Sequence, residues 1–119
     1  MRKAQLRLPR LTLFSDENFR GRVRIFRGNR AIRNTERIFD EPESLRFRSN
    51  GRGATLVLFA RPNFRGAFRI IRRSRNIRDV ERFTGFDVDS ILMSSIRMTR
   101  QQVLNIRRTG RLPRRFRVF

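Results

Sequence analysis

Residues 11–21 read LTLFSDENFRG, and the chain repeats this stretch 45 residues later as LVLFARPNFRG at residues 56–66. Aligned without gaps, residues 11–37 and 56–82 are identical at 15 of 27 positions. Six of these matches are Arg in an Arg-rich chain, but the others include Leu, Ile, Phe, Asn and Gly. A repeat of this length indicates two copies of one supersecondary unit, which must be recognised before a fold is assigned.

The first copy has the pattern of a β-hairpin followed by a closing strand. Residues 11–14 are predicted to form the first strand, and the Ser, Asp, Glu and Asn at residues 15–18 favour a turn. Polar and apolar side chains then alternate over residues 22–26, which is typical of a half-buried strand. A polar connection at residues 30–43 follows, and residues 45–48 resume the alternation and close the unit.

The second copy repeats this plan. Strands are predicted at residues 56–59, 67–72 and 90–98, with a polar connection at residues 73–88. Residues 49–53 read SNGRG and form a flexible link between the copies. Both copies are therefore predicted to fold into the same strand order.

The predicted organisation is one β domain between two basic arms. Its parts are a basic N-terminal arm at residues 1–10, motif one at 11–49 and motif two at 54–99 within a domain at 11–99, and an Arg-rich C-terminal arm at 100–119. The C-terminal arm carries seven Arg, which favours a solvated tail. Its apolar residues, Ile106, Phe116 and Val118 among them, would also allow it to add as a strand to an exposed sheet edge.

Composition excludes several kinds of chemistry. The 119 residues carry a formal net charge of +20, and all of the 30 basic residues except Lys3 are Arg, which pairs bidentately with carboxylate and phosphate. The chain has no Cys and no His, so it lacks disulfides and the usual nucleophile, base and transition-metal ligands. We therefore expect a protein that is not an enzyme.

The N-terminal residues are basic but lack the apolar run of a signal peptide, and no stretch is apolar enough for a membrane span. We expect cytoplasmic synthesis, with the final compartment left open, a spore or an intracellular assembly being two alternatives.

Both copies carry the same short motif. An aromatic residue is followed by four residues, a second aromatic, one residue and a Gly, and a Ser stands before an apolar residue further along. These residues are Phe14, Phe19, Gly21 and Ser44 in the first copy and Phe59, Phe64, Gly66 and Ser90 in the second. The pattern resembles the Greek-key signature of the βγ-crystallins, and the resemblance covers about residues 11–99.

The resemblance implies an all-β, double Greek-key β-sandwich of two four-stranded antiparallel sheets. It also implies that the aromatic residues and the Gly shape a folded-over hairpin, into which the Ser forms hydrogen bonds. Phe stands where the family often has Tyr or Trp, so the hydrogen bond of a tyrosine corner is missing. The pairs Phe14 with Phe19 and Phe59 with Phe64 are expected to remain as packing.

Microbial members of this family often bind calcium through a run of Asn or Asp residues that ends in Ser. The corresponding windows here, residues 39–44 and 85–90, are degenerate, although acidic residues remain in them, namely Asp40, Glu43, Asp87 and Asp89. Oxygen-rich loops suit a hard cation, but the net positive charge opposes one. We expect no cofactor, keep calcium as a weaker alternative, and expect these acids to pair with Arg within the subunit or across a contact.

Two functional classes follow from these patterns. The first is a non-catalytic structural protein that assembles with itself or with acidic partners into a durable array or coat, as spore-coat members of the family do. The alternative is a module that binds a polyanion, nucleic acid included. The candidate contacts for either are Arg69, Arg72, Arg73, Arg75, Arg78, Arg107, Arg108, Arg114, Arg115 and Arg117. A secreted inhibitor or toxin is a third and weaker hypothesis.

Overall fold

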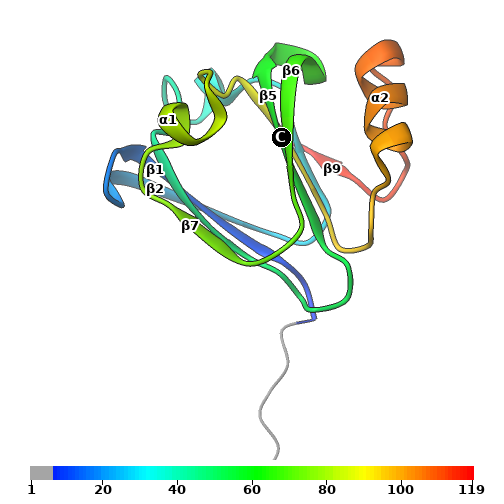
Figure 1. The fold of residues 1–119 in the computed structure, drawn as a ribbon, viewed down its shortest axis with the longest axis horizontal. Coiled ribbons are helices and arrows are strands. Elements are labelled where there is room, and N and C mark those ends of the chain that lie inside the picture. Colours follow the sequence, from blue (N-terminus) through cyan, green and yellow to red (C-terminus); the bar gives the residue numbers. More distant parts are fainter. Residues whose placement is uncertain (1–6) are drawn as a thin grey trace, which may run out of the picture.

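Two β-sheets packed face to face form the molecule, in a computed structural model that describes residues 7–119 (Figure 1). The first sheet has the strand order β2-β1-β4-β7, and the second has the order β6-β5-β8-β3-β9. The strands are β1 (Arg10–Asp16), β2 (Arg20–Arg27), β3 (Arg30–Ile32), β4 (Ser44–Arg48), β5 (Thr55–Arg61), β6 (Arg65–Ile71), β7 (Arg75–Ile77), β8 (Ser90–Ser94) and β9 (Arg117–Val118). The predicted all-β, two-sheet sandwich is confirmed, with β9 as a fifth strand added to the second sheet. Most of the predicted N-terminal arm, residues 1–6, lies outside the described residues.

The two motifs exchange one strand each. In the first motif, β1, β2 and β4 lie in the first sheet, whereas β3 pairs antiparallel with β8 of the second. The second motif keeps β5, β6 and β8 together and sends β7 to pair antiparallel with β4. This exchange is the reason why the two copies fold as one domain: each sheet is completed by a strand from the other motif.

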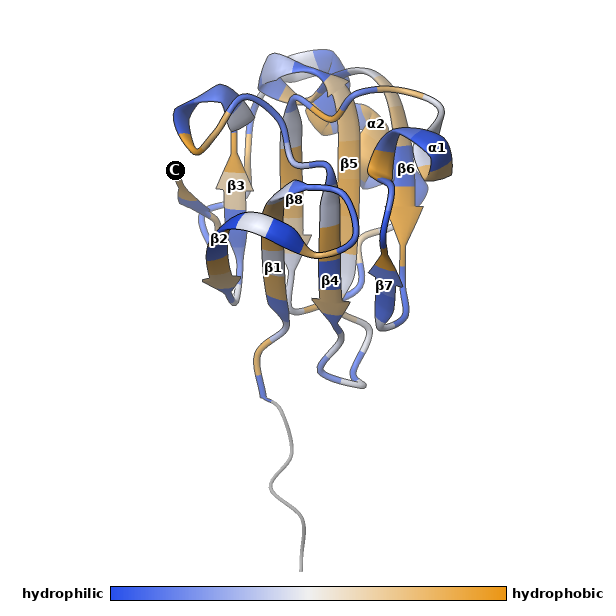
Figure 2. Ribbon diagram, turned by 90° about the vertical axis from the view of Figure 1, so that its left-hand side faces the viewer, coloured by the Kyte–Doolittle hydropathy of each residue, from blue (hydrophilic) through white to orange (hydrophobic). Residues whose placement is uncertain are grey.

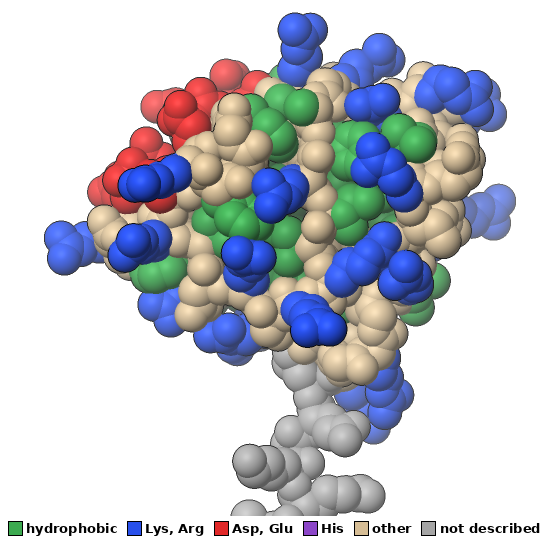
Figure 3. Space-filling model, in the orientation of Figure 1, with side chains coloured by type: hydrophobic (Ala, Val, Ile, Leu, Met, Phe, Trp, Pro, Cys, Tyr) green, Lys and Arg blue, Asp and Glu red, His purple; other side chains and the backbone are tan. Residues whose placement is uncertain are grey.

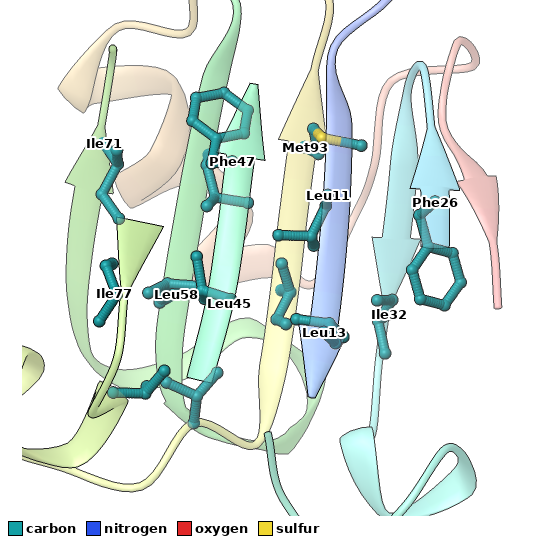
Figure 4. Close-up of a cluster of buried hydrophobic side chains, with 14 of the residues drawn as sticks. Leu11, Leu13, Phe26, Ile32, Leu45, Phe47, Leu58, Ile71, Ile77 and Met93 are labelled. Atoms are coloured by element: carbon teal, nitrogen blue, oxygen red, sulfur yellow. The ribbon is translucent and has the colours of Figure 1, made fainter. Parts of the chain in front are cut away.

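The inward faces of both sheets form the core (Figure 4). Leu11 and Leu13 of β1 are fully buried against side chains of the second sheet such as Leu58 and Met93. Successive side chains of a strand point to opposite faces, so the polar residues between these core positions face outward. The period-2 pattern predicted from the sequence is the pattern that builds this core.

Short helices interrupt the polar connections. The connection of the first motif contains β3 and a 3-10 turn, η1 (Thr35–Arg37), and that of the second contains β7 and the helix α1 (Val80–Thr84). A further 3-10 turn, η2 (Pro62–Phe64), forms the tip of the second hairpin. The strand predicted at residues 90–98 is shorter than expected, because β8 ends at Ser94.

The predicted C-terminal arm, residues 100–119, is instead a helix and a strand that pack on the domain. Helix α2 (Arg100–Thr109) begins after Thr99, which forms a reciprocal capping box with Gln102, and ends at Gly110 in the left-handed conformation. Its buried residues Val103 and Ile106 pack on the outer face of the second sheet. Strand β9 pairs in parallel with β3, so the alternative of strand addition holds for the last residues, on the chain's own sheet edge.

Candidate functional site

A folded-over hairpin forms the tip of each motif, and its Ser clamp is the same in both. In the first motif, Ser44 Oγ accepts a hydrogen bond from the Phe19 amide at 2.9 Å and donates one to the Asp16 carbonyl at 2.6 Å. In the second, Ser90 Oγ accepts from the Phe64 amide at 2.9 Å and donates to the Arg61 carbonyl at 2.6 Å. Each Ser thus joins the two sides of its hairpin.

The hairpin tips use a backbone conformation that is rare for residues other than Gly. Asn18 and Phe19 both have φ near 59°, and Asn63 and Phe64 have φ of 60° and 62°. Gly21 has φ of 83°, and a Cβ atom at that position would collide with the Ser15 hydroxyl. The glycine of the motif is therefore required both by its dihedral angle and by the close approach of the folded hairpin.

The aromatic pairs of the signature pack edge to face. The ring centroids of Phe14 and Phe19 lie 5.6 Å apart at an interplanar angle of 73°, and those of Phe59 and Phe64 lie 5.7 Å apart at 63°. These edge-to-face contacts hold the folded hairpin against the sheet.

Each hairpin tip also bonds to the connection of the other motif. The Asn18 amide donates to the Arg78 carbonyl at 2.9 Å, and the Asn63 amide donates to the Arg33 carbonyl at 2.8 Å. The signature residues are therefore used by the fold.

The acidic residues gather at one end of the sandwich. Six of them line a narrow hollow, which we call the acidic cap: Glu17, Glu41, Glu43, Asp79, Glu81 and Asp87. They come from the first hairpin, the loop before β4, and the region around α1. Figure 3 shows the red side chains at one edge of the visible face, with blue Arg side chains spread over the rest.

Three Glu side chains of the cap have raised pKa values. Burial and the nearby Asp87 and Asp89 raise the pKa of Glu41, and burial with Glu17 and Asp16 raises the pKa of Glu43. Repulsion by Asp87 is the main cause that raises the pKa of Glu81. Burial is the largest cause for Glu41 and Glu43, and repulsion between neighbouring carboxylates contributes to all three shifts.

The causes that raise the pKa of Glu41, Glu43 and Glu81 are burial and neighbouring carboxylates. Pairing of the acids with Arg, within the subunit or across a contact, stays a prediction. Glu43 and Asp87 lie in the cap, whereas Asp40 is exposed and Asp89 is half-buried, where burial raises its pKa. No group of three or more potential ligands in this part of the chain is placed to hold a metal ion.

Arg side chains line a second feature, an open groove of about 690 Å³ beside β6, which we call the Arg groove. Its charged and aromatic residues are Arg69, Arg72, Arg73, Arg75, Arg100 and Phe83. The Arg69 and Arg75 guanidinium carbons lie 4.5 and 4.3 Å from the centroid of the Phe83 ring. Sequence reasoning missed Arg100, because only the packing of α2 brings it to the groove.

The predicted C-terminal contacts separate into two groups. Arg107 donates to the Gly66 carbonyl at 3.2 Å, and Arg115 donates to Ser94 Oγ at 3.3 and 3.2 Å, with burial lowering the pKa of Arg115. Both therefore attach the C-terminal segment to the domain. In contrast, Arg108, Arg114 and Arg117 are exposed, and so is Arg78 at the end of β7.

No helix in the described part of the chain is long and apolar enough to cross a membrane.

Comparisons with known proteins find the fold but no sequence relative. No protein-family model matches the chain, and no curated protein matches it. Among solved structures, a domain described in terms of the evolution of the eye-lens βγ-crystallin domain fold matches with a TM-score of 0.58 and 16% identity over 79% of this chain and 93% of that one.

Two further structures match at 19% identity over 74% of this chain. The fifth crystallin domain of the non-lens protein Absent in melanoma 1 has a TM-score of 0.55 and is covered over 89% of its length. The IPSE/alpha-1 protein from Schistosoma mansoni eggs has a TM-score of 0.54 and is covered over 86%. The two strand-exchanged Greek keys, their Ser clamps and these matches together show that the chain has the βγ-crystallin domain fold.

Proposed function

We propose that the chain is a non-catalytic structural protein. It assembles by packing its acidic cap against the Arg-rich surface of a neighbouring copy or of a partner protein with a similar basic surface. One observation carries this proposal: six carboxylates line one hollow, and burial and neighbouring carboxylates raise the pKa of Glu41, Glu43 and Glu81. A cation-rich surface of another molecule would relieve this repulsion between the cap carboxylates.

The net charge of +20 sets the geometry of such a contact. Like-charged Arg surfaces repel, so the cap is the part of the described surface through which a second copy is attracted. A contact between a cap and a different surface is heterologous, and heterologous contacts extend into rings or open arrays. The acidic cap thus favours an ordered array over a closed dimer.

Salt determines when this contact forms. At about 0.1–0.15 M salt the Debye length is roughly 8–10 Å, which is shorter than the 13.5 Å radius of gyration of the molecule. Repulsion between whole molecules is then screened, whereas ion pairs at contact distance are screened less. We expect assembly at moderate salt and its loss at high salt, about 1 M, where the Debye length is near 3 Å.

A charge-neutralising variant tests the proposal. The triple substitution Glu17→Gln, Glu41→Gln and Glu81→Gln removes three cap charges with little change of shape, and light scattering at moderate salt should report loss of assembly. The control raises the net charge by the same three units but on α2, through Gln101→Lys, Asn105→Lys and Thr109→Lys, and it should assemble as the wild type does. Equal assembly by the Gln variant and the wild type would remove the cap from the mechanism.

A second candidate function, polyanion binding, is favoured by the Arg groove. Five guanidinium groups and one aromatic ring line one open groove, and this combination suits phosphates together with a stacking base. Proteins that neutralise phosphates bind with an affinity that falls steeply with salt.

The groove can be tested with single-stranded DNA. Substituting Arg69, Arg73 and Arg75 by Gln should reduce the salt slope by about 2, at roughly 0.7 for each lost phosphate contact. A matched loss of three charges at Arg108, Arg114 and Arg117 should leave most of the slope in place. Equal effects of the two triple variants would show that DNA binds through diffuse charge rather than through the groove.

A further inference from the structure

The outer face of the first sheet is the uncovered counterpart of the face on which α2 packs. With the 45-residue offset of the repeat, Val23 and Ile25 of β2 correspond to Phe68 and Ile70 of β6. Phe68 and Ile70 pack into the apolar cluster that includes α2 residues. Val23 and Ile25 are 48% and 51% exposed. In Figure 2 the first sheet faces the viewer, and α2 lies behind the second sheet.

The outer face continues from the exposed Val23 and Ile25 across three strands, over the half-exposed Thr12 and Arg46 and the buried Phe14. Cross-strand pairing sets Val23 beside Phe14 and sets Ile25 beside Thr12, which in turn pairs with Arg46 of β4. The alternation of β4 points Arg46 outward, because its neighbours Leu45 and Phe47 are fully buried in the core. We call the surface formed by these five outward residues the β2-β1-β4 face.

The β2-β1-β4 face differs from its counterpart in its charge. Arg46 stands where the second motif has Leu92, and its guanidinium carbon lies 4.3 Å from the centroid of the Phe19 ring. The Nε atom of Arg46 is buried and has no hydrogen-bond acceptor. A row of three further Arg, paired across the strands, borders the apolar part: Arg27, Arg10 and Arg48.

We propose that the β2-β1-β4 face is a docking site for an acidic amphipathic helix of a partner protein. The chain itself shows that the equivalent face of this fold accepts a helix, because α2 seats Val103 and Ile106 on it. The Arg border selects the chemistry of the occupant: apolar side chains cover Val23 and Ile25, and carboxylates flank them to meet the Arg row.

The chain's own helices do not fit this description. Helix α2 carries Arg in its last turn and is already seated, and α1 has only five residues. A second copy is a poorer occupant than an acidic helix, because it presents Arg on its own equivalent face and the two faces would repel. This docking uses a different surface from the acidic cap and does not depend on the proposed assembly.

The experiment measures the binding of a labelled peptide to the full chain by fluorescence anisotropy. The probe is a designed helical peptide of about 14 residues, a usual helix length, with Leu on one face and Glu on both flanks. Its controls are a scrambled peptide of the same composition and a peptide with Gln in place of Glu. We expect the amphipathic acidic peptide to bind at least about tenfold more tightly than either control, a difference of roughly 1.4 kcal/mol.

A double variant, Val23→Ser with Ile25→Ser, should weaken binding of the amphipathic peptide by about tenfold or more and leave the weak binding of the scrambled peptide unchanged. The matched control is Ile96→Ser, which removes another exposed apolar side chain, 53% exposed and just after β8 of the second sheet. Urea unfolding of each variant separates lost binding from lost folding.

Two results would overturn the proposal. One is equal binding of the amphipathic and scrambled peptides to the wild type, or of the amphipathic peptide to the wild type and the double variant. The other is self-association of the wild type that the double variant abolishes in the absence of peptide, which would assign the face to a second copy. Loss of assembly in the Gln variant of the acidic cap leaves this docking unaffected, so the two proposals fail separately.

Discussion

Replacing Ser90 by Ala tests how the folded hairpin is held. Ser90 is fully buried, and its hydroxyl accepts from the Phe64 amide and donates to the Arg61 carbonyl. Each hydrogen bond contributes about 1 kcal/mol net, and a buried amide without a partner costs about 1–3 kcal/mol. Phe64 is itself fully buried and has a positive φ, so water cannot replace the hydroxyl without rearrangement. We expect a loss of about 2–4 kcal/mol in the free energy of unfolding.

Ser44→Ala is the matched comparison, because it removes the same two bonds in the first motif. Phe19 is half-exposed, so water can reach its amide, and we expect a smaller loss of about 1–2 kcal/mol. Urea unfolding measures both as a shift of the midpoint at constant slope. Gln101→Ala on the exposed side of α2 should change stability by less than about 0.5 kcal/mol. If both Ser variants unfold at the wild-type midpoint, or if Ser44→Ala is the costlier of the two, the burial argument for the clamp is wrong.

Three further predictions concern stability. Gly21→Ala should cost more than Gly110→Ala, because both pay about 1–2 kcal/mol for a left-handed backbone but only the first also collides with Ser15; equal midpoints in urea would contradict this. Burial and neighbouring carboxylates raise the pKa of Glu41 above its ordinary 4.5, so the folded state binds that proton more tightly than the unfolded state does, and stability should rise as pH falls from 7 through the raised pKa towards 4.5. Glu41→Gln should flatten this part of the pH profile, and an unchanged profile would mean that the repulsion in the cap is not felt. Ile106→Ala should cost about 2–4 kcal/mol by opening the contact of α2 with the second sheet, whereas the half-exposed Leu104→Ala should cost less than about 1 kcal/mol; similar thermal midpoints would show that α2 is not a stabilising cover.

The repeat made the scaffold predictable. Local signals, the alternation at residues 22–26 and the aromatic and Gly spacing, are enough to place the hairpins, because a folded hairpin depends on residues close in sequence. The exchange of β3 and β7 between sheets could not be read from the chain itself, since three-residue strands leave little periodic pattern. The resemblance to a known fold supplied that topology.

The sequence contains some of the signals that predict the C-terminal helix. Thr99 and Gln102 have the spacing of a capping box, and Gly110 stands where a helix usually ends. A dense run of Arg hid these signals, because α2 buries only Val103 and Ile106 and its remaining residues resemble a solvated tail.

The acidic cap was predictable only as two acidic stretches of sequence. The sequence places most of the acids before the closing strand of each motif, and the pseudo-symmetric fold then brings both stretches to one end. Whether Arg or other acids surround them depends on which loops meet in three dimensions, and in the cap other acids are among the causes that raise the pKa of Glu41, Glu43 and Glu81.

The central claim is that the acidic cap of one molecule meets the Arg surface of another. The chain has no Cys, so Arg82→Cys, exposed on α1 beside the cap, provides a single attachment point for a photo-crosslinker and keeps every carboxylate. Mixing isotope-labelled and unlabelled chains at moderate salt identifies crosslinks between copies by mass spectrometry. We expect crosslinks from the cap to Arg-rich segments of the neighbour, whereas crosslinks from cap to cap, or none between copies, would contradict this contact.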